Sequence, residues 1–108
     1  MAKKETYKII LSGGAQGVVN VAGKLDASGT DGGEVDIDGA TVELADTSEI
    51  SVDGDDQAGT IIAWGDELYS YGMLSALGQN GFIETSMRES GIIDGAAALG
   101  ENGEYLID

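Results

Sequence analysis

The sequence contains no cysteine, no histidine and no proline among its 108 residues. Without cysteine or histidine, the chain cannot form disulfides, bind zinc through those ligands, or build a catalytic triad that uses histidine. Basic residues are also scarce, with five against 20 acidic ones and a formal net charge of −15. Such a surface repels phosphates and anionic lipid headgroups, so we expect no nucleic-acid binding and no adsorption to acidic membranes.

Long apolar runs are absent as well. No segment is long enough to span a bilayer, and the charged start at residues 1–5 is not followed by the apolar core of a signal peptide, so we expect no membrane insertion. Hydrophobic residues nevertheless make up 42% of the chain, which argues against disorder. We therefore expect one folded module over residues 1–108, with residues 1–6 as an N-terminal tail or cap.

Glycine is abundant, and its 18 copies lie between short segments of alternating polarity. One signature, an apolar residue followed four positions later by glycine, recurs at 25–29, 50–54 and 74–78, so its copies begin 25 and 24 residues apart. A fixed period of about 20 to 50 residues indicates a structural repeat, and alternation within each copy indicates strands. The sequence thus predicts an all-β solenoid of about four coils, with three short parallel strands in each coil.

The predicted coils place specific side chains over one another. Successive side chains of a strand point to opposite faces, and stacked strands lie about 4.8 Å apart, so equivalent apolar residues should form ladders inside the solenoid. We expect three such ladders: Leu25, Ile50 and Leu74; Ala27, Val52 and Ala76; and Val35, Ile61 and Ile83.

The best helical candidate is the alanine-rich segment 94–99. It is short and interrupted or flanked by Gly95 and Gly100, so we predict a loop or a single turn there instead of a helix.

The acidic clusters invite a calcium interpretation, but their spacing does not support it. Segment 53–59 begins like an EF-hand loop, yet Ala58 occupies the position that requires glycine, and Trp64 occupies the place of the final glutamate. Segment 31–38 lacks the nine-residue period of calcium-binding solenoids. We therefore expect no metal and no cofactor.

The alternative to a purely structural role is catalysis. Polysaccharide-cleaving β-helices use paired carboxylates, and stacked coils could bring Asp26 and Asp53 within the roughly 5 to 9 Å that such chemistry needs. However, Arg88 is the only arginine, and no basic cluster is present to hold an acidic sugar. We therefore expect that the protein is not an enzyme.

Two unlike motifs, Asn-Gly-Phe-Ile-Glu-Thr-Ser at 80–86 and Glu-Tyr-Leu-Ile-Asp at 104–108, follow each other in the order found in one family. With the segment 16–29, they resemble filamentous-haemagglutinin-type exoproteins of two-partner secretion systems, over about residues 7 to 108. Departures are residues 87–90, where that family usually has glycine, Tyr105 in place of tryptophan, and the missing proline after the second motif. The resemblance implies a right-handed parallel β-helix.

The resemblance also implies a function. The chain would be a structural segment of a secreted bacterial adhesin, a stiff shaft that presents binding regions at the cell surface. Its partners would be a host-cell receptor or glycan and, during export, an outer-membrane transporter. The alternative is an excised or designed solenoid module for self-assembly, with no ligand of its own.

Two surface features remain open. Lys3, Lys4 and Lys8 lie at the start of an otherwise acidic chain, so coil ends of opposite charge could stack into a homo-oligomer; the charges could equally serve solubility alone. Trp64, Tyr69 and Tyr71 form a candidate contact surface for a receptor or glycan, and packing within the solenoid is the alternative role for these rings.

Overall fold

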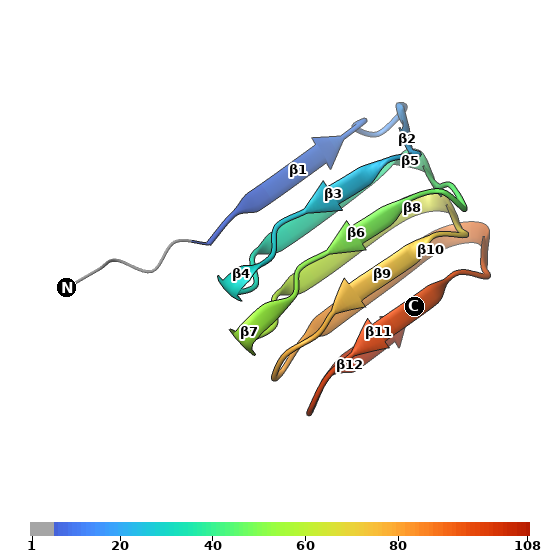
Figure 1. The fold of residues 1–108 in the computed structure, drawn as a ribbon. Coiled ribbons are helices and arrows are strands. Elements are labelled where there is room, and N and C mark those ends of the chain that lie inside the picture. The colour runs from blue at the N-terminus through green and yellow to red at the C-terminus, as the bar shows by residue number, and fades with distance from the viewer. Residues whose placement is uncertain (1–5) are drawn as a thin grey trace.

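The computed structural model describes residues 6–108, which wind in a right-handed sense into a parallel β-solenoid of four coils (Figure 1). Every element of this described part is a strand, so it offers no helix that could cross a membrane. The predicted all-β fold is therefore confirmed. The predicted tail or cap lies outside the described residues except for Thr6, which leads into the first strand.

The coils build a broad parallel sheet of five passes, which we call the long sheet; the fifth pass is the C-terminal strand after the fourth coil. In its first pass the strand is divided by the loop at 13–17, and the two parts pair with successive halves of the next strand. The strands of the long sheet are β1 (Lys8–Ser12), β2 (Val18–Val21), β5 (Glu34–Leu44), β8 (Thr60–Ser70), β10 (Phe82–Ile93) and β12 (Glu104–Ile107).

A second parallel sheet, the short sheet, closes the other side of the solenoid. Two coils have a third strand at the turn that leads from the short sheet back to the long sheet. The short sheet contains β3 (Lys24–Asp26), β6 (Glu49–Ser51), β9 (Met73–Ala76) and β11 (Ala96–Leu99); the turn strands are β4 (Gly29–Asp31) and β7 (Gly54–Gln57).

The structure divides the coils differently from the sequence prediction in two places. Three short strands were expected in each coil, whereas β5 and β8 are continuous strands of 11 residues that run through Gly39 and Gly65. The segment 96–99, predicted as loop or turn, is strand β11 and pairs with β9 in full register, so that prediction was wrong. Packing against a preformed strand edge outweighs the low strand preference of alanine there.

The interior consists of stacked side chains. Ile50 lies between Leu25 and Leu74 on neighbouring strands, and Ile61 lies in the same way between Val35 and Ile83. All of these except Leu25, which belongs to the terminal coil, are at most 1% exposed. The third set, Ala27, Val52 and Ala76, is fully buried as well.

Coil length changes along the chain. Val35 and Ile61 are register partners 26 residues apart, whereas Ile61 and Ile83 are only 22 apart. The shorter coil replaces the turn strand by a tight turn in which Gly78 has φ +124° and Asn80 has φ +60°. A side chain at Gly78 would be strained by this φ and would also meet the Gly54 carbonyl oxygen at 2.6 Å.

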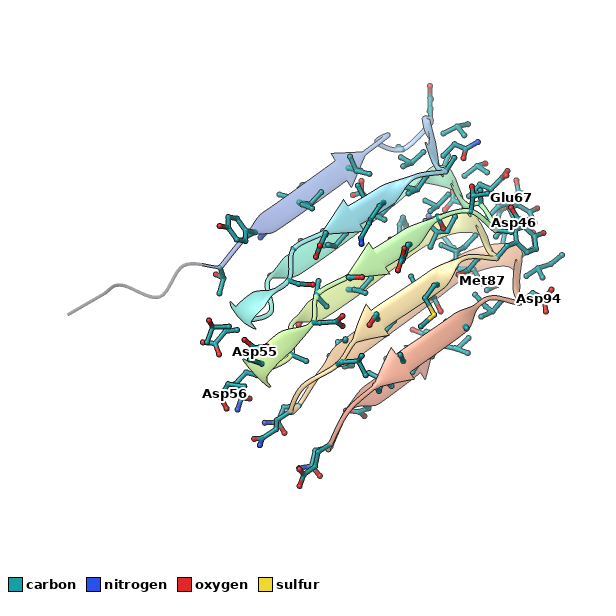
Figure 2. The ribbon with its side chains drawn as sticks, in the orientation of Figure 1. Asp46, Asp55, Asp56, Glu67, Met87 and Asp94 are labelled. Atoms are coloured by element: carbon teal, nitrogen blue, oxygen red, sulfur yellow. The ribbon has the colours of Figure 1, made fainter. Side chains whose placement is uncertain are left out.

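The middle of the long sheet carries a second irregularity. Gly39, Gly65 and Met87 occupy equivalent positions on β5, β8 and β10. Between Met87 and Ser90 the register of β10 shifts by one residue, which makes a β-bulge and lengthens this strand to 12 residues. Met87, labelled in Figure 2, packs against the core. Relative to β8, residues 87–90 thus contain one inserted residue, which the fold absorbs as the bulge.

Candidate functional site

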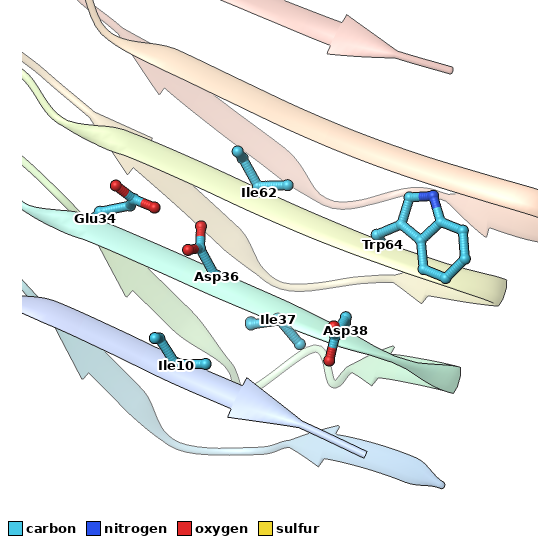
Figure 3. A pocket seen from close by; sticks show the side chains of 7 residues that line it. All are labelled: Ile10, Glu34, Asp36, Ile37, Asp38, Ile62 and Trp64. Carbon is cyan, nitrogen blue, oxygen red and sulfur yellow. The ribbon is translucent and has the colours of Figure 1, made fainter. Parts of the chain in front are cut away.

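The outer face of the long sheet carries an open groove of about 330 Å³, shown in Figure 3. It crosses three adjacent strands, with contributions from β1, β5 and β8. We call it the Trp64 groove, and its lining residues are Ile10, Glu34, Asp36, Ile37, Asp38, Ile62 and Trp64.

Strand alternation explains this combination of residues. On β5, Val35 and Ile37 point into the core, so Glu34, Asp36 and Asp38 form a row of carboxylates on the outside. The register places Ile62 beside Asp36 and Trp64 beside Asp38 on the neighbouring strand. The same strand geometry that fills the interior with aliphatic side chains therefore places acidic and apolar side chains together on the outer face.

The apolar part of the groove is accessible. Trp64 is 42% exposed and Ile10 is 61% exposed, although both belong to a regular sheet. Exposed large apolar residues gathered in one concave place mark contact sites more often than scattered ones do. The packing role considered for Trp64 does not match this exposure.

Lys8 partly neutralises the acidic row. Its Nζ atom lies 3.5 Å from Glu34 Oε2 and 3.8 Å from Asp36 Oδ2. A hydrogen bond from Asp36, together with the charge of Lys8, lowers the pKa of Glu34, whereas burial and the neighbouring Glu34 raise the pKa of Asp36. Ionising both neighbouring carboxyl groups is unfavourable, and the opposite pKa shifts mean that Asp36 holds its proton more tightly than Glu34 does.

Of the three aromatic residues proposed as one contact surface, Trp64 lines the groove, whereas Tyr69 and Tyr71 do not. Tyr69 lies further along β8, where its hydroxyl donates a hydrogen bond of 2.7 Å to Glu67, and this bond raises the tyrosine pKa. Tyr71 follows the end of β8 and lines another cavity of about 380 Å³ with Glu43, Asp46 and Asp94. Figure 2 shows Asp46 and Asp94 close to this end of the coil. Only Trp64 belongs to the groove.

Asp26 and Asp53, the carboxylates considered for catalysis, are engaged in turns. Asp26 Oδ1 accepts the backbone N–H of Ser28, and hydrogen bonding with Ser28 lowers the pKa of Asp26. Asp53 Oδ1 accepts hydrogen bonds from the Ser75 hydroxyl at 2.6 Å and the Leu77 N–H at 2.8 Å. Asp26 is not the register partner of Asp53; it lies opposite Ser51. These contacts hold successive turns together.

No group of three or more acidic side chains within residues 6–108 is arranged to hold a metal ion. In the segment 53–59, which begins like a calcium loop, one Asp53 oxygen is occupied by the two hydrogen bonds above, and the following residues form β7.

Sequence reasoning identified Trp64 as a candidate contact residue but not the groove in which it lies beside the carboxylate row. The signal was present in the alternation Glu34, Asp36, Asp38, which predicts one row of carboxylates once the segment is known to be a strand. What the sequence lacked was the register, because the neighbours Ile10 and Ile62 lie 26 residues away on either side.

Comparison with known proteins gives no match: no family model, no curated protein and no solved structure is similar to this chain. The resemblance to filamentous-haemagglutinin-type exoproteins therefore depends on the motifs in the sequence, to which the structure adds the β-solenoid fold.

Proposed function

We propose that this chain is a structural segment of a secreted bacterial adhesin, in which stacked coils form part of a stiff shaft at the cell surface. The supporting observation is that the two family-like motifs are neighbours in space. Residues 82–85 on β10 pair in register with residues 104–107 on β12, so the motifs follow each other as equivalent passes of the same sheet. Its partners would be an outer-membrane transporter during export and a host receptor or glycan.

The shape of the chain fits a segment better than a complete rod. Five passes of the long sheet at about 4.8 Å each give a stack of roughly 20 Å, which is shorter than an 11-residue strand is long. A shaft therefore needs many more coils, each stabilised by its neighbours, and parallel stacking allows such extension.

We propose no catalytic role. A general acid for glycoside cleavage needs a raised pKa, whereas the pKa of Asp26 is lowered. Asp53 is held in hydrogen bonds of the turns.

Export tests the shaft proposal. The chain would be placed behind the secretion domain of a filamentous-haemagglutinin-type exoprotein and produced together with the matching transporter. We expect the segment to reach the cell surface in a protease-resistant form, and the variant Ile61→Asp, which puts a charge into the core, to arrive protease-sensitive. Retention of the unaltered chain inside the cell, or its degradation at the surface, would refute the proposal.

The second candidate, a solenoid module for self-assembly, is favoured by the open strand edges at both coil ends. Within residues 6–108, β12 pairs with residues 82–85 of β10 and leaves 90–93 without a strand neighbour on that side, while β1 and β2 pair with β5 alone. Such edges promote association. Sedimentation velocity over a range of salt and protein concentrations distinguishes the candidates, because a monomer under all conditions excludes self-assembly and leaves the shaft proposal intact.

A further inference from the structure

We propose that the Trp64 groove binds basic side chains of an extended peptide, with a lysine or arginine head group held by Asp36 and Asp38 against the Trp64 ring. This inference does not depend on the shaft role, since it concerns a surface that is open in the isolated chain.

The first argument is a cation that the chain itself places there. The Lys8 ammonium group lies within 3.8 Å of both Glu34 and Asp36, so one end of the carboxylate row already binds a basic side chain. At the other end, the neighbour of Asp38 on β1 is Ser12, and no basic side chain within residues 6–108 forms an ion pair with Asp38. One lysine against three carboxylates leaves the groove negative and its far end available to a second cation.

The second argument is the position of Trp64. It is the register neighbour of Asp38, and its ring is partly exposed at the free end of the row. A cation over an indole face is attracted by the ring electrons, and an adjacent carboxylate adds a charged partner. The methylene stem of lysine or arginine can then pack on Ile10 and Ile62, which form the apolar part of the groove (Figure 3).

The third argument is spacing. Alternate residues of an extended strand are roughly 7 Å apart, so the side chains of Glu34, Asp36 and Asp38 leave the β5 backbone at this interval. Basic residues at alternate positions of an extended peptide repeat at the same distance. A peptide lying along β5 can therefore place its basic side chains in step with the row. The groove volume of about 330 Å³ accommodates side chains of this kind.

The test uses the sole tryptophan of the chain, because Trp64 fluorescence reports directly on the groove. The intact protein would be titrated at low ionic strength with a short synthetic peptide that alternates lysine and threonine. The comparison ligands are the same peptide with glutamate in place of lysine, and a neutral oligosaccharide. We expect a saturable change with the lysine peptide only, and an affinity that falls several-fold between about 0.01 M and 0.15 M salt.

Two matched double variants separate a site from general attraction to an acidic protein. Asp36→Asn with Asp38→Asn removes two charges from the groove, whereas Asp55→Asn with Asp56→Asn removes two exposed charges from β7, a strand that does not line the groove. We expect about tenfold weaker binding for the first and less than about twofold for the second. Trp64→Leu, followed by calorimetry, should weaken binding about threefold.

Three results would overturn the proposal. Equal losses in the two double variants would show diffuse attraction without a site. A saturable response to the oligosaccharide and none to the lysine peptide would make the groove a glycan site. No saturable response to any ligand, in protein whose circular dichroism shows the native fold, would leave the groove without this role.

Discussion

Ser75 donates a hydrogen bond of 2.6 Å to Asp53, although the two residues belong to different coils and are 22 positions apart in the sequence. The same Asp53 oxygen accepts the N–H of Leu77, and the N–H of Asp53 donates to the hydroxyl of Ser28 in the preceding coil. Ser28 in turn donates its N–H to Asp26. A polar ladder thus runs along the turns beside the aliphatic ladders of the interior.

Removing the centre of this ladder should destabilise the fold. In Asp53→Ala, the buried Ser75 hydroxyl and the Leu77 N–H lose their acceptor, so we expect the free energy of unfolding to fall by about 1 to 3 kcal/mol. Urea denaturation measures the change. Asp55→Ala, on the same turn but exposed, should stay within about 0.5 kcal/mol of the parent, and equal effects would show that Asp53 acts only through its charge.

The sequence predicted the interior well because alternation and period both follow from strand geometry. Leu25, Ile50 and Leu74 could be aligned by counting alone, since they are 25 and 24 residues apart. The polar ladder could not be predicted, because its hydrogen bonds depend on the conformations of the turns. These conformations bring Asp53 to Ser75, whereas Asp26 is not a partner of Asp53.

Gly39 and Gly65 illustrate a different limit. Glycine within an apolar stretch commonly marks a turn or a break in a strand, so the sequence alone favours short strands on either side of both residues. The structure keeps the strands continuous because the equivalent positions of successive coils stack on each other. Only the contact between coils shows that these glycines provide space and do not form corners.

The two adjacent isoleucines of β8 should respond very differently to truncation. Ile61 is fully buried between Val35 and Ile83, whereas Ile62 lies on the outer face beside Asp36. We expect Ile61→Ala to lower the free energy of unfolding by about 2 to 5 kcal/mol, through lost burial and an unfilled cavity. For Ile62→Ala we expect less than about 1 kcal/mol, because this side chain loses little burial.

Chemical denaturation of both variants under identical conditions provides the measurement. The residue type and the change are the same and the positions are consecutive, so differences in strand preference cancel. Comparable losses in the two variants would mean that the ladder through Ile61 is not the main source of stability in this coil.

Gly65 should not tolerate even one methyl group. A Cβ atom there would lie 2.7 Å from the Glu67 carbonyl oxygen and 3.3 Å from the Gly39 carbonyl oxygen. We expect Gly65→Ala to cost about 1 to 3 kcal/mol of unfolding free energy, although the equivalent position of β10 holds methionine. The one-residue bulge after Met87 changes the local path of β10, and β8 has no such bulge.

Gly23→Ala is the matched control, because a Cβ atom at Gly23 meets no other atom within 4 Å. There the loss of unfolded-state freedom should leave stability unchanged or raise it by up to about 1 kcal/mol. Thermal melts of both variants compare them directly. A Gly65→Ala protein as stable as Gly23→Ala would show that β8 can bend as β10 does.

Asp36 should make stability depend on pH in an unusual direction. Burial raises the pKa of Asp36 above the ordinary value of an aspartate, so the folded state holds this proton more tightly than the unfolded state does. As the pH rises through the raised pKa, the ionised group opposes folding, and this cost persists at neutral pH. Asp36→Asn should therefore be more stable than the parent at pH 7.

The gain should shrink as the pH falls through the raised pKa and should disappear below about pH 3.8, because the parent carboxyl is then protonated in both states. Urea midpoints at several pH values, compared with those of Asp56→Asn at equal net charge, isolate this contribution. If Asp36→Asn is instead less stable at pH 7, the ion pair with Lys8 outweighs the cost of burial and of the neighbouring Glu34. The acidic row would then be a source of stability, and its charges would not need a binding role to account for them.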